Sequence, residues 1–268
     1  DGARVVLGWP GSSEMSRGRI SGFTAQLRDC GVELVEQPED MIGRIDAVLV
    51  LSLCGGVHLD RVRPFLEVGI PAYVDKPFAC SSEDAEEIVR LAVAHDTFVY
   101  GTSALRFSED VKQFQSRESV HGRLNGVLVY GPAKRAEGNP GLFHYGIHAV
   151  ELLYTLMGTG VERVSAICCD GADVVTGSWS DGRVAGLRGN RAGSTAYGFT
   201  AFCDQAVIEQ RVSSRYAYRN LCRTIVAGIE SKQPAVANNV TLEIVRFVLA
   251  ALESERLNGE PVALGAIK

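Results

Sequence analysis

The chain has 268 residues, a formal net charge of −5 and a sequence isoelectric point near 5.6. Hydrophobic residues make up 46% and charged residues 22% of it, as in a globular protein of one or two domains. It has no basic region that could hold a nucleic-acid backbone, and no apolar run approaches the roughly 20 residues that span a bilayer. We therefore expect a soluble protein with no nucleic-acid or membrane partner.

Seven cysteines are spread along the chain, and no two of them form a C-x-x-C pair. An odd number in a chain of this length argues against a disulfide framework, and the spacing argues against a structural zinc site. We interpret most of them as small core residues in a reducing compartment. The sequence therefore predicts a cytoplasmic location.

The first hundred residues alternate between expected strands and expected helices. Short apolar strands are predicted at 3–8, 32–35, 46–51, 71–74 and 97–100. Helical spacing follows at 20–27, from 58 to a stop near Gly69, and from Ser81 onward. Strand 46–51 is apolar without alternation, which is typical of burial on both faces of a parallel sheet. The pattern predicts an α/β domain with a doubly wound parallel sheet over residues 1–104.

The pattern changes after Leu105. A helix near 109–117 and a strand at 126–130 lead to a helix at 148–157. Five strand-like runs then follow, separated by short Gly, Asp and Asn turns, at 164–168, 173–177, 183–187, 195–202 and 206–212. Two helices, at about 216–229 and 240–257, close the chain. This succession predicts an antiparallel meander, and hence a second, α+β domain with a mostly antiparallel sheet over residues 105–268.

Two clusters carry the candidate chemistry. The first begins at strand 46–51, includes His58 and ends in Val-Asp-Lys-Pro at 74–77. The second is Gly-Leu-Phe-His-Tyr-Gly-Ile-His at 141–148, followed by Glu151. With the closing helices and last strand, they resemble the glucose–fructose oxidoreductase / inositol dehydrogenase / MocA (Gfo/Idh/MocA) family. In that family the first cluster ends in Glu-Lys-Pro and the second is usually Gly-x-x-x-Asp-x-Gly-x-His.

The resemblance extends over about residues 3–264. It implies a Rossmann-like dinucleotide-binding domain, an α+β substrate-binding and dimerisation domain, and NAD or NADP as cofactor. The implied enzyme is an NAD(P)-dependent oxidoreductase acting on a carbohydrate-like alcohol, as a homodimer or homotetramer. One alternative is a non-catalytic sugar- or dinucleotide-binding protein on the same fold. Another is an enzyme that uses tightly held NAD for transient oxidation during hydrolysis or elimination.

Two features depart from the family pattern. The Gly-x-Gly-x-x-Gly turn is absent, and strand 3–8 aligns better with the family's second strand than with its first. We therefore expect the natural protein to carry roughly 30 further residues, one strand–helix unit, before Asp1. In addition, His144 stands where the family usually has an aspartate. This change of charge and geometry favours the binding-protein alternative.

Three residues are the candidates for catalysis. Lys76 follows a parallel strand, where such sheets bind ligands, and it can orient a hydroxyl and pass its proton; alternatively it is a surface lysine paired with Asp75. His148 begins a helix and can take the alcohol proton as hydride leaves; alternatively it caps the helix. His144 either assists them or is a substitution that followed loss of catalysis.

Further residues are expected to bind the cofactor and the substrate. No acidic residue follows strand 3–8, so Ser12, Ser13 and Arg17 could accept the 2′-phosphate of NADP or form a solvated turn. The expected cofactor-binding residues are Trp9, Ser12, Ser13, Arg17, Ser52, Leu53, Cys54, His58, Asp75, Lys76 and Pro77. Arg106 and Tyr145 are expected at the substrate, although a surface arginine and a core tyrosine are the alternatives. We expect no metal, because His144 precedes the helix that carries His148 and Glu151.

Overall fold

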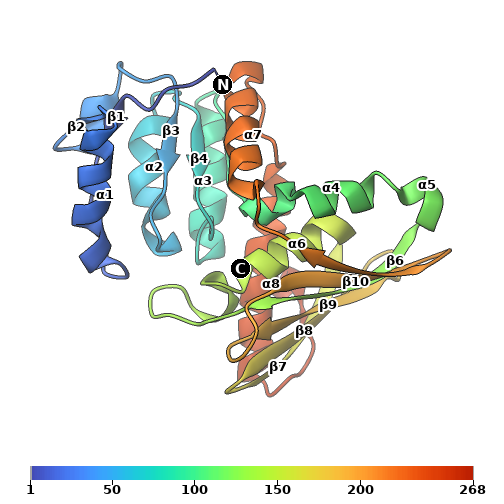
Figure 1. Ribbon diagram of the computed structural model, residues 1–268. Helices are drawn as coiled ribbons and strands as arrows, with labels where there is room; N and C mark the ends of the chain where they lie inside the picture. Colours follow the sequence, from blue (N-terminus) through green and yellow to red (C-terminus); the bar gives the residue numbers. More distant parts are fainter. Residues whose placement is uncertain (1, 268) are drawn as a thin grey trace.

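The computed structural model describes residues 2–267 (Figure 1). In the first domain short parallel strands alternate with helices, as predicted. The elements are β1 (Leu7–Gly8), α1 (Arg17–Asp29), β2 (Glu33–Leu34), η1 (Pro38–Met41), β3 (Val48–Val50), η2 (Gly55–Val57), α2 (His58–Leu66), β4 (Ala72–Val74), α3 (Ser82–Ala94) and β5 (Val99–Tyr100), where η denotes a 3-10 helix. The predicted cap of α3 is present, because Ser81 Oγ accepts the backbone N–H of Asp84 at 3.1 Å.

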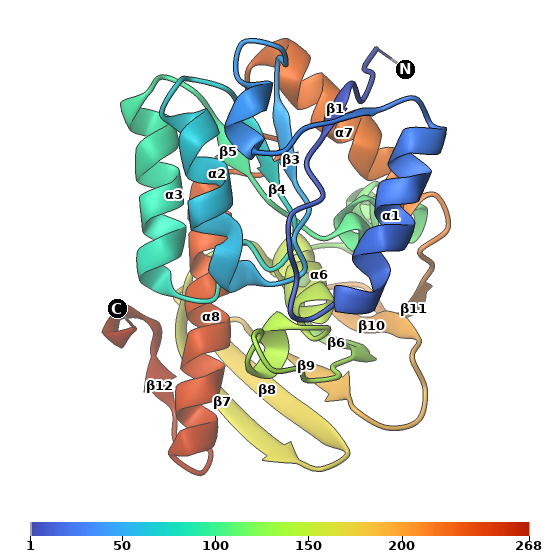
Figure 2. The ribbon, with the colours of Figure 1, turned by 90° about the vertical axis from the view of Figure 1, so that its left-hand side faces the viewer.

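The parallel sheet is divided into two parts. β1 pairs with β2, and β3, β4 and β5 form a separate three-stranded sheet. Among residues 2–267 no strand pairing joins the two parts. Helix α1 is the outermost helix beside β1 and β2 and has no buried residue (Figures 1 and 2).

Two predictions for this sheet are wrong. The expected strand 3–8 is paired only at Leu7 and Gly8, while Val5 and Val6 are 59% and 41% exposed. Strand β3 is not buried on both faces, because Leu49 between two buried valines is 42% exposed. In both places the described residues leave apolar side chains uncovered, so the apolar run in the sequence overstates the burial.

The second domain is built on a seven-stranded sheet. Its elements begin with η3 (Ala104–Phe107), α4 (Glu109–Gln115), α5 (Glu118–His121), β6 (Leu124–Pro132), η4 (Gly141–Phe143) and α6 (Ile147–Met157). They continue with β7 (Val161–Cys169), β8 (Ala172–Trp179), β9 (Val184–Asn190), β10 (Tyr197–Cys203), β11 (Val207–Val212), α7 (Ala217–Ser231), α8 (Asn238–Arg256), β12 (Val262–Ala263) and η5 (Leu264–Ala266).

The strand order is β11-β10-β6-β9-β8-β7-β12. Only β6 and β9 run parallel, so the prediction of a mostly antiparallel sheet is confirmed. The simple meander is wrong, because β6 inserts between β9 and β10. Strand order of this kind depends on long-range pairing that no local sequence pattern specifies. Helices α6 and α8 pack on one face of the sheet (Figure 1).

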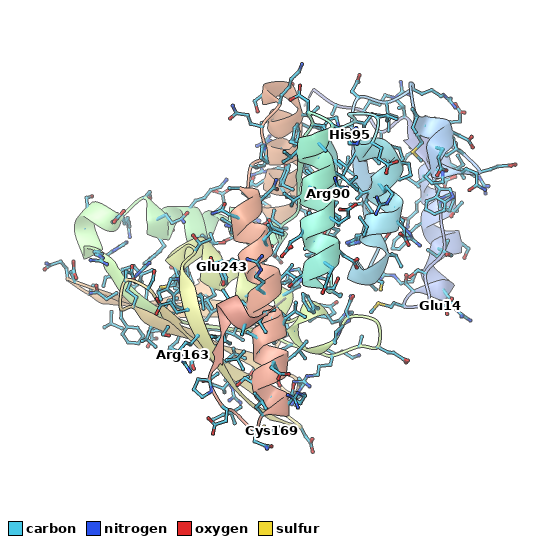
Figure 3. All side chains as sticks on the ribbon, turned by 180° about the vertical axis from the view of Figure 1, so that it is seen from behind. Glu14, Arg90, His95, Arg163, Cys169 and Glu243 are labelled. Carbon is cyan, nitrogen blue, oxygen red and sulfur yellow. The ribbon has the colours of Figure 1, made fainter. Side chains whose placement is uncertain are left out.

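The two C-terminal helices connect the domains. On α7, Leu221 and Ile225 pack with Tyr73 of β4 and Tyr100 of β5, so this helix covers part of the first domain. Helix α8 lies against α3 and also against β7. Glu243 of α8, marked in Figure 3, accepts the backbone N–H groups at 160 and 161 at 2.8 and 2.9 Å. None of the helices in residues 2–267 combines the length and the apolar character needed to cross a membrane.

Candidate active site

The segment after β4 supplies the first part of the site. Asp75 continues the strand by donating its backbone N–H to Val50 O at 2.9 Å, and Lys76 and Pro77 follow through a cis peptide bond. Burial raises the pKa of Asp75, while the charge of Lys76 opposes that shift. Within residues 2–267 the ammonium of Lys76 has no ion-pair partner within 4 Å. The charge of Lys76 can therefore act on titratable side chains of the second domain.

Two histidines from the second domain lie near enough to Lys76 for its charge to act on their rings. His148 lies in the first turn of α6, and His144 follows η4 four residues earlier. Burial lowers the pKa of His148 to about 3, and the charges of Lys76 and His144 add to that shift. Burial, Lys76 and Lys134 lower the pKa of His144. The structure thus brings the three candidate catalytic residues together, with both imidazoles favoured in the neutral form.

His144 and His148 differ in their hydrogen bonds. His148 Nδ1 lies 2.7 Å from Ser103 Oγ. His144 Nδ1 is buried and has no hydrogen-bond partner among the described residues. A buried ring nitrogen without a partner is costly, and it is a group that a bound ligand could satisfy.

A buried ion pair lies one helical turn after His148 on α6. Arg106 Nη2 donates to Glu151 Oε2 at 2.7 Å, and the two side chains are only 14% and 6% exposed. Thr102 Oγ1 donates to the same carboxylate oxygen at 2.9 Å and accepts Arg106 Nε–H, also at 2.9 Å. Arg106, expected at the substrate, therefore has its guanidinium engaged by Glu151. The pair fixes α6 to the segment that follows β5.

The loop after β3 is held by both domains. The ring of His58 is buried, with Nε2 2.8 Å from Ser52 O and Nδ1 3.2 Å from Phe78 O. Leu53 O accepts Asn139 Nδ2–H at 2.7 Å, and Cys54 Sγ donates to Gly138 O at 3.4 Å. The predicted cofactor residues in this loop therefore lie beside the segment after β4, and a loop of the second domain covers them.

Gly55 permits a close approach at this point. A Cβ on Gly55 would lie 2.8 Å from Pro77 Cγ and 2.9 Å from Cys80 Sγ, closer than real contacts allow. The loop after β3 can therefore rest directly on the Lys76–Pro77 turn only because residue 55 is glycine.

The turn after β1 reaches this loop through Arg61. The guanidinium of Arg61 donates to Ser12 O at 2.6 Å and to Ser52 Oγ, and it lies 5.4 Å from the ring centre of Trp9. Trp9, Ser12 and Ser52 are thus connected. Ser13 and Arg17 instead interact within the turn, Ser13 with Ser16 and Arg17 with Glu14.

Four residues of the site were not anticipated from the sequence. Arg61 lies three residues after His58 on α2, and this spacing could have indicated it. Ser103, Tyr197 and Tyr218 had no local signal. The ring centre of Tyr197 lies 6.0 Å from that of His148, and Tyr145, an expected substrate residue, lies 6.1 Å from His148. Burial and the nearby charge of Asp75 raise the pKa of Tyr218, so tyrosines from three separate parts of the second domain border the site.

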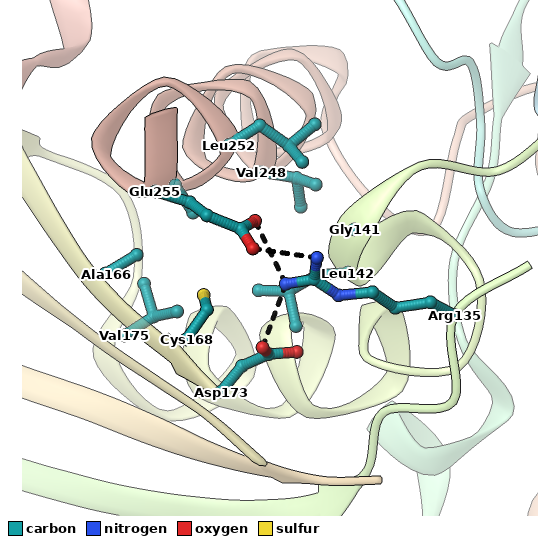
Figure 4. Close-up of a pocket in the computed structure, with 11 residues that line it drawn as sticks. Arg135, Gly141, Leu142, Ala166, Cys168, Asp173, Val175, Val248, Leu252 and Glu255 are labelled. Atoms are coloured by element: carbon teal, nitrogen blue, oxygen red, sulfur yellow. Dashed lines mark hydrogen bonds and ion pairs between the residues drawn. The ribbon is translucent and has the colours of Figure 1, made fainter. Parts of the chain in front are cut away.

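A separate small cavity is lined by Arg135, Gly141 and Leu142 of the segment before His144, together with residues of β7, β8 and α8. Figure 4 shows Arg135 between Asp173 and Glu255, with nitrogen–oxygen distances of 2.8 to 3.0 Å. The cavity of about 10 Å³ could hold one water molecule at most. We therefore interpret this ion cluster as a fastening of the 133–146 segment to β8 and α8. Within residues 2–267 no three His, Cys, Asp or Glu side chains are grouped so as to hold a metal ion.

Part of the sequence matches a known family model, and the fold is similar to solved structures. Residues 19–102 match the family model GFO_IDH_MocA, described as an oxidoreductase family with an NAD-binding Rossmann fold. No curated protein sequence matches the chain. Its fold is similar to that of many solved structures.

Three of these structures illustrate the similarity. A probable dehydrogenase from Thermotoga maritima has a TM-score of 0.82 at 16% identity, over 92% of this chain and 90% of its own. Scyllo-inositol dehydrogenase from Lactobacillus casei, solved with NAD(H) and scyllo-inositol, has 0.80 at 16% identity, over 98% and 100%. Myo-inositol dehydrogenase from the same organism, solved with NAD(H) and myo-inositol, has 0.80 at 14%, over 98% and 89%.

The matched segment contains α1 to β5 and the Lys76–Pro77 turn, and the second domain has the fold of the dehydrogenases just described. In sequence, residues 19–102 are thus similar to the Gfo/Idh/MocA family of oxidoreductases, and over nearly its whole length the chain has the fold of these dehydrogenases.

Proposed function

We propose that the protein is an NAD(P)-dependent oxidoreductase that transfers a hydride between a nicotinamide cofactor and a sugar- or polyol-like alcohol. The observation that carries this proposal is the convergence of Lys76, His144 and His148 between the end of β4 and the start of α6. It is supported by the NAD-binding family model over residues 19–102 and by the inositol dehydrogenases of the same fold.

The residues present fit a dinucleotide along the ends of the parallel strands, where such sheets bind ligands. The nicotinamide end is assigned to Lys76, Pro77 and the loop 52–56, and the unpartnered His144 Nδ1 offers a further contact. The phosphate end is assigned to Arg61, whose guanidinium lies beside Trp9 and Ser12. When bound, the nicotinamide supplies or accepts the hydride.

The proton of the reacting oxygen is assigned to the three candidate catalytic residues. Lys76 precedes Pro77, which lies against Gly55 of the loop after β3, and it has no ion-pair partner among the described residues. We assign to it the orientation of the hydroxyl and the transfer of its proton. Both imidazoles, kept neutral by burial, serve as hydrogen-bonding groups to the substrate.

A sugar- or polyol-like substrate is supported by the tyrosines. Tyr145 comes from the turn before α6, Tyr197 from β10 and Tyr218 from α7, and they border the histidines and Asp75. Tyrosine combines an apolar ring with a hydroxyl that can donate or accept a hydrogen bond. Such a wall suits a molecule that has both C–H faces and several hydroxyl groups.

A direct test is hydride transfer with a panel of substrates. Purified protein is mixed with NAD⁺ or NADP⁺ and, one at a time, inositol isomers, hexoses and sugar acids, while absorbance at 340 nm is followed. We expect a rise with at least one member, and a rate about 10²–10⁴-fold lower in Lys76→Met. An unchanged rate in that variant would remove Lys76 from the mechanism.

The second candidate function is a non-catalytic sugar- or dinucleotide-binding protein. It is favoured by the division of the parallel sheet between β1–β2 and β3–β5, and by the position of His144 where the family usually has a carboxylate. Cofactor or sugar binding without hydride transfer to any member of the panel would support this candidate over the first.

We also propose that the protein is a homodimer, or a tetramer built from such dimers. Register places six exposed apolar side chains on the sheet face away from α6 and α8: Leu128, Ile167, Val174, Val184, Phe202 and Val207. A broad exposed apolar face of this kind is typical of an interface, here with a second copy. Light scattering tests this, because the measured mass of Leu128→Lys should shift towards that of the monomer.

The seven free thiols support a cytoplasmic location.

A further inference from the structure

Ser103 and His148 share a buried hydrogen bond between the two domains. Ser103 Oγ lies 2.7 Å from His148 Nδ1, and Ser103 has no exposed surface. The same oxygen accepts the backbone N–H of Leu105, at 3.2 Å, where it caps η3. These are the hydrogen bonds of Ser103 Oγ within residues 2–267. Because Thr102 and Arg106 bind Glu151 one turn further along α6, the segment that carries Ser103 is fixed to the helix that carries His148.

Only one arrangement of the hydrogens satisfies every atom of this group. A serine hydroxyl has one hydrogen to donate and two lone pairs that accept. If His148 Nδ1–H donated to Ser103, the buried hydroxyl hydrogen would have no acceptor. Leaving it unpaired disfavours that arrangement by about tenfold or more. The hydroxyl therefore donates to Nδ1, and the neutral ring carries its hydrogen on Nε2.

The remaining ring nitrogen is open to the site. His148 Nε2 has no hydrogen-bond partner and is not among the fully buried polar atoms of the described residues. The groups that face the ring are Lys76, His144, Tyr145 and Tyr197, none of which is a carboxylate. Nothing on these elements would draw the hydrogen from Nε2 or stabilise a positively charged ring.

We propose that Ser103 is a positioning residue that holds His148 as its Nε2–H tautomer, so that this ring donates a hydrogen bond to the reacting oxygen of the substrate. The proposal rests on the proposed oxidoreductase function. In this tautomer Nε2 has no lone pair with which to accept an alcohol proton. During alcohol oxidation the substrate O–H bond breaks and its proton passes to the amine form of Lys76, while the hydride leaves the carbon for the nicotinamide. In carbonyl reduction the ammonium form of Lys76 returns the proton. His148 keeps its own proton throughout and stabilises the charge on the oxygen.

The tautomer can be measured without cofactor or substrate. Long-range ¹H–¹⁵N spectra of the ¹⁵N-labelled full chain distinguish a protonated from an unprotonated nitrogen in each of the five histidines. The signals of His148 are those that disappear in His148→Gln. We expect its Nε2 to be protonated and its Nδ1 unprotonated at neutral pH. A wild-type His148 that carries its hydrogen on Nδ1 overturns the proposal and leaves the proposed function untouched.

Variants of Ser103 test whether this residue sets the tautomer. Ser103→Ala should give a mixture of tautomers and a kcat lowered by about tenfold, with KM for the cofactor nearly unchanged. Ser103→Thr keeps the hydroxyl and should restore both the spectrum and kcat. Ser108→Ala is the matched control, because Ser108 is equally buried and caps α4 but does not contact a histidine. If Ser103→Ala retains both the wild-type tautomer and the wild-type kcat, Ser103 has no such role.

Discussion

Asn139 and Gly55 join the two domains, because Asn139 Oδ1 accepts the backbone N–H of Gly55 at 3.0 Å across 84 residues of sequence. The same amide donates from Nδ2 to Leu53 O at 2.7 Å, and it is fully buried. Gly138, beside it, has a φ of +91°, a conformation that favours glycine. One side chain of the second domain thereby fixes the loop after β3 against the Lys76–Pro77 turn.

Asn139→Ala is expected to destabilise the protein. The substitution leaves a buried N–H at Gly55 and a partly buried carbonyl at Leu53 without partners, which destabilises the fold by about 1–3 kcal/mol. For a chain of this size that corresponds to a fall in Tm of roughly 2–4 °C per kcal/mol. Differential scanning calorimetry measures it, with Asn125→Ala, on the exposed surface, as the control. Equal Tm values for the two variants would show that the two hydrogen bonds of Asn139 do not contribute to stability.

Arg106→Met is expected to be among the most destabilising single changes. It leaves Glu151 charged, only 6% exposed and without its cation, which typically costs about 3–5 kcal/mol. The matched control is Arg256→Met, which removes an exposed i,i+3 pair with Glu253 and should leave the free energy of unfolding nearly unchanged. Urea unfolding compares the free energies, and similar losses in both variants would contradict this account of the buried pair.

Stability is expected to fall as pH is lowered below the ordinary histidine pKa of about 6.5. Burial lowers the pKa of His148 to about 3 and also lowers that of His58. Between those values the unfolded chain binds protons that the folded protein does not, so stability is full above about pH 6.5 and decreases by about 1.4 kcal/mol per pH unit for each such histidine.

Urea unfolding between pH 5 and pH 8 measures this dependence. His148→Gln removes one of the groups and should give a shallower fall than the wild type, whereas His95→Gln, at an exposed helix end, should not. A wild-type slope equal to that of His148→Gln would mean that His148 does not contribute.

The sequence predicted most elements because their signals are local. Alternating apolar strands and capped helices, such as Ser81 before α3, depend on neighbours within a few residues. The failures are non-local. The insertion of β6 between β9 and β10 and the exposure of Leu49 depend on which elements meet in space.

For the site, too, the residues with a local motif could be predicted and those without one could not. Lys76, His144 and His148 lie in two recognisable motifs, so their meeting could be expected from the family resemblance. Ser103, Tyr197 and Tyr218 reach the site from η3, β10 and α7, and they have no motif of their own. The position of Arg106 after β5 predicts a place at the substrate, but no local pattern indicates that Glu151, 45 residues later, engages its charge.

The central claim is that this chain binds a nicotinamide dinucleotide at the ends of its parallel strands. Isothermal titration calorimetry with NAD⁺, NADH, NADP⁺ and NADPH tests it most directly, with Arg61→Ala as the variant that removes the cation between Ser12 and Ser52. The account predicts saturable binding of at least one of the four, weakened in Arg61→Ala. No binding of any of them to folded wild-type protein would contradict it.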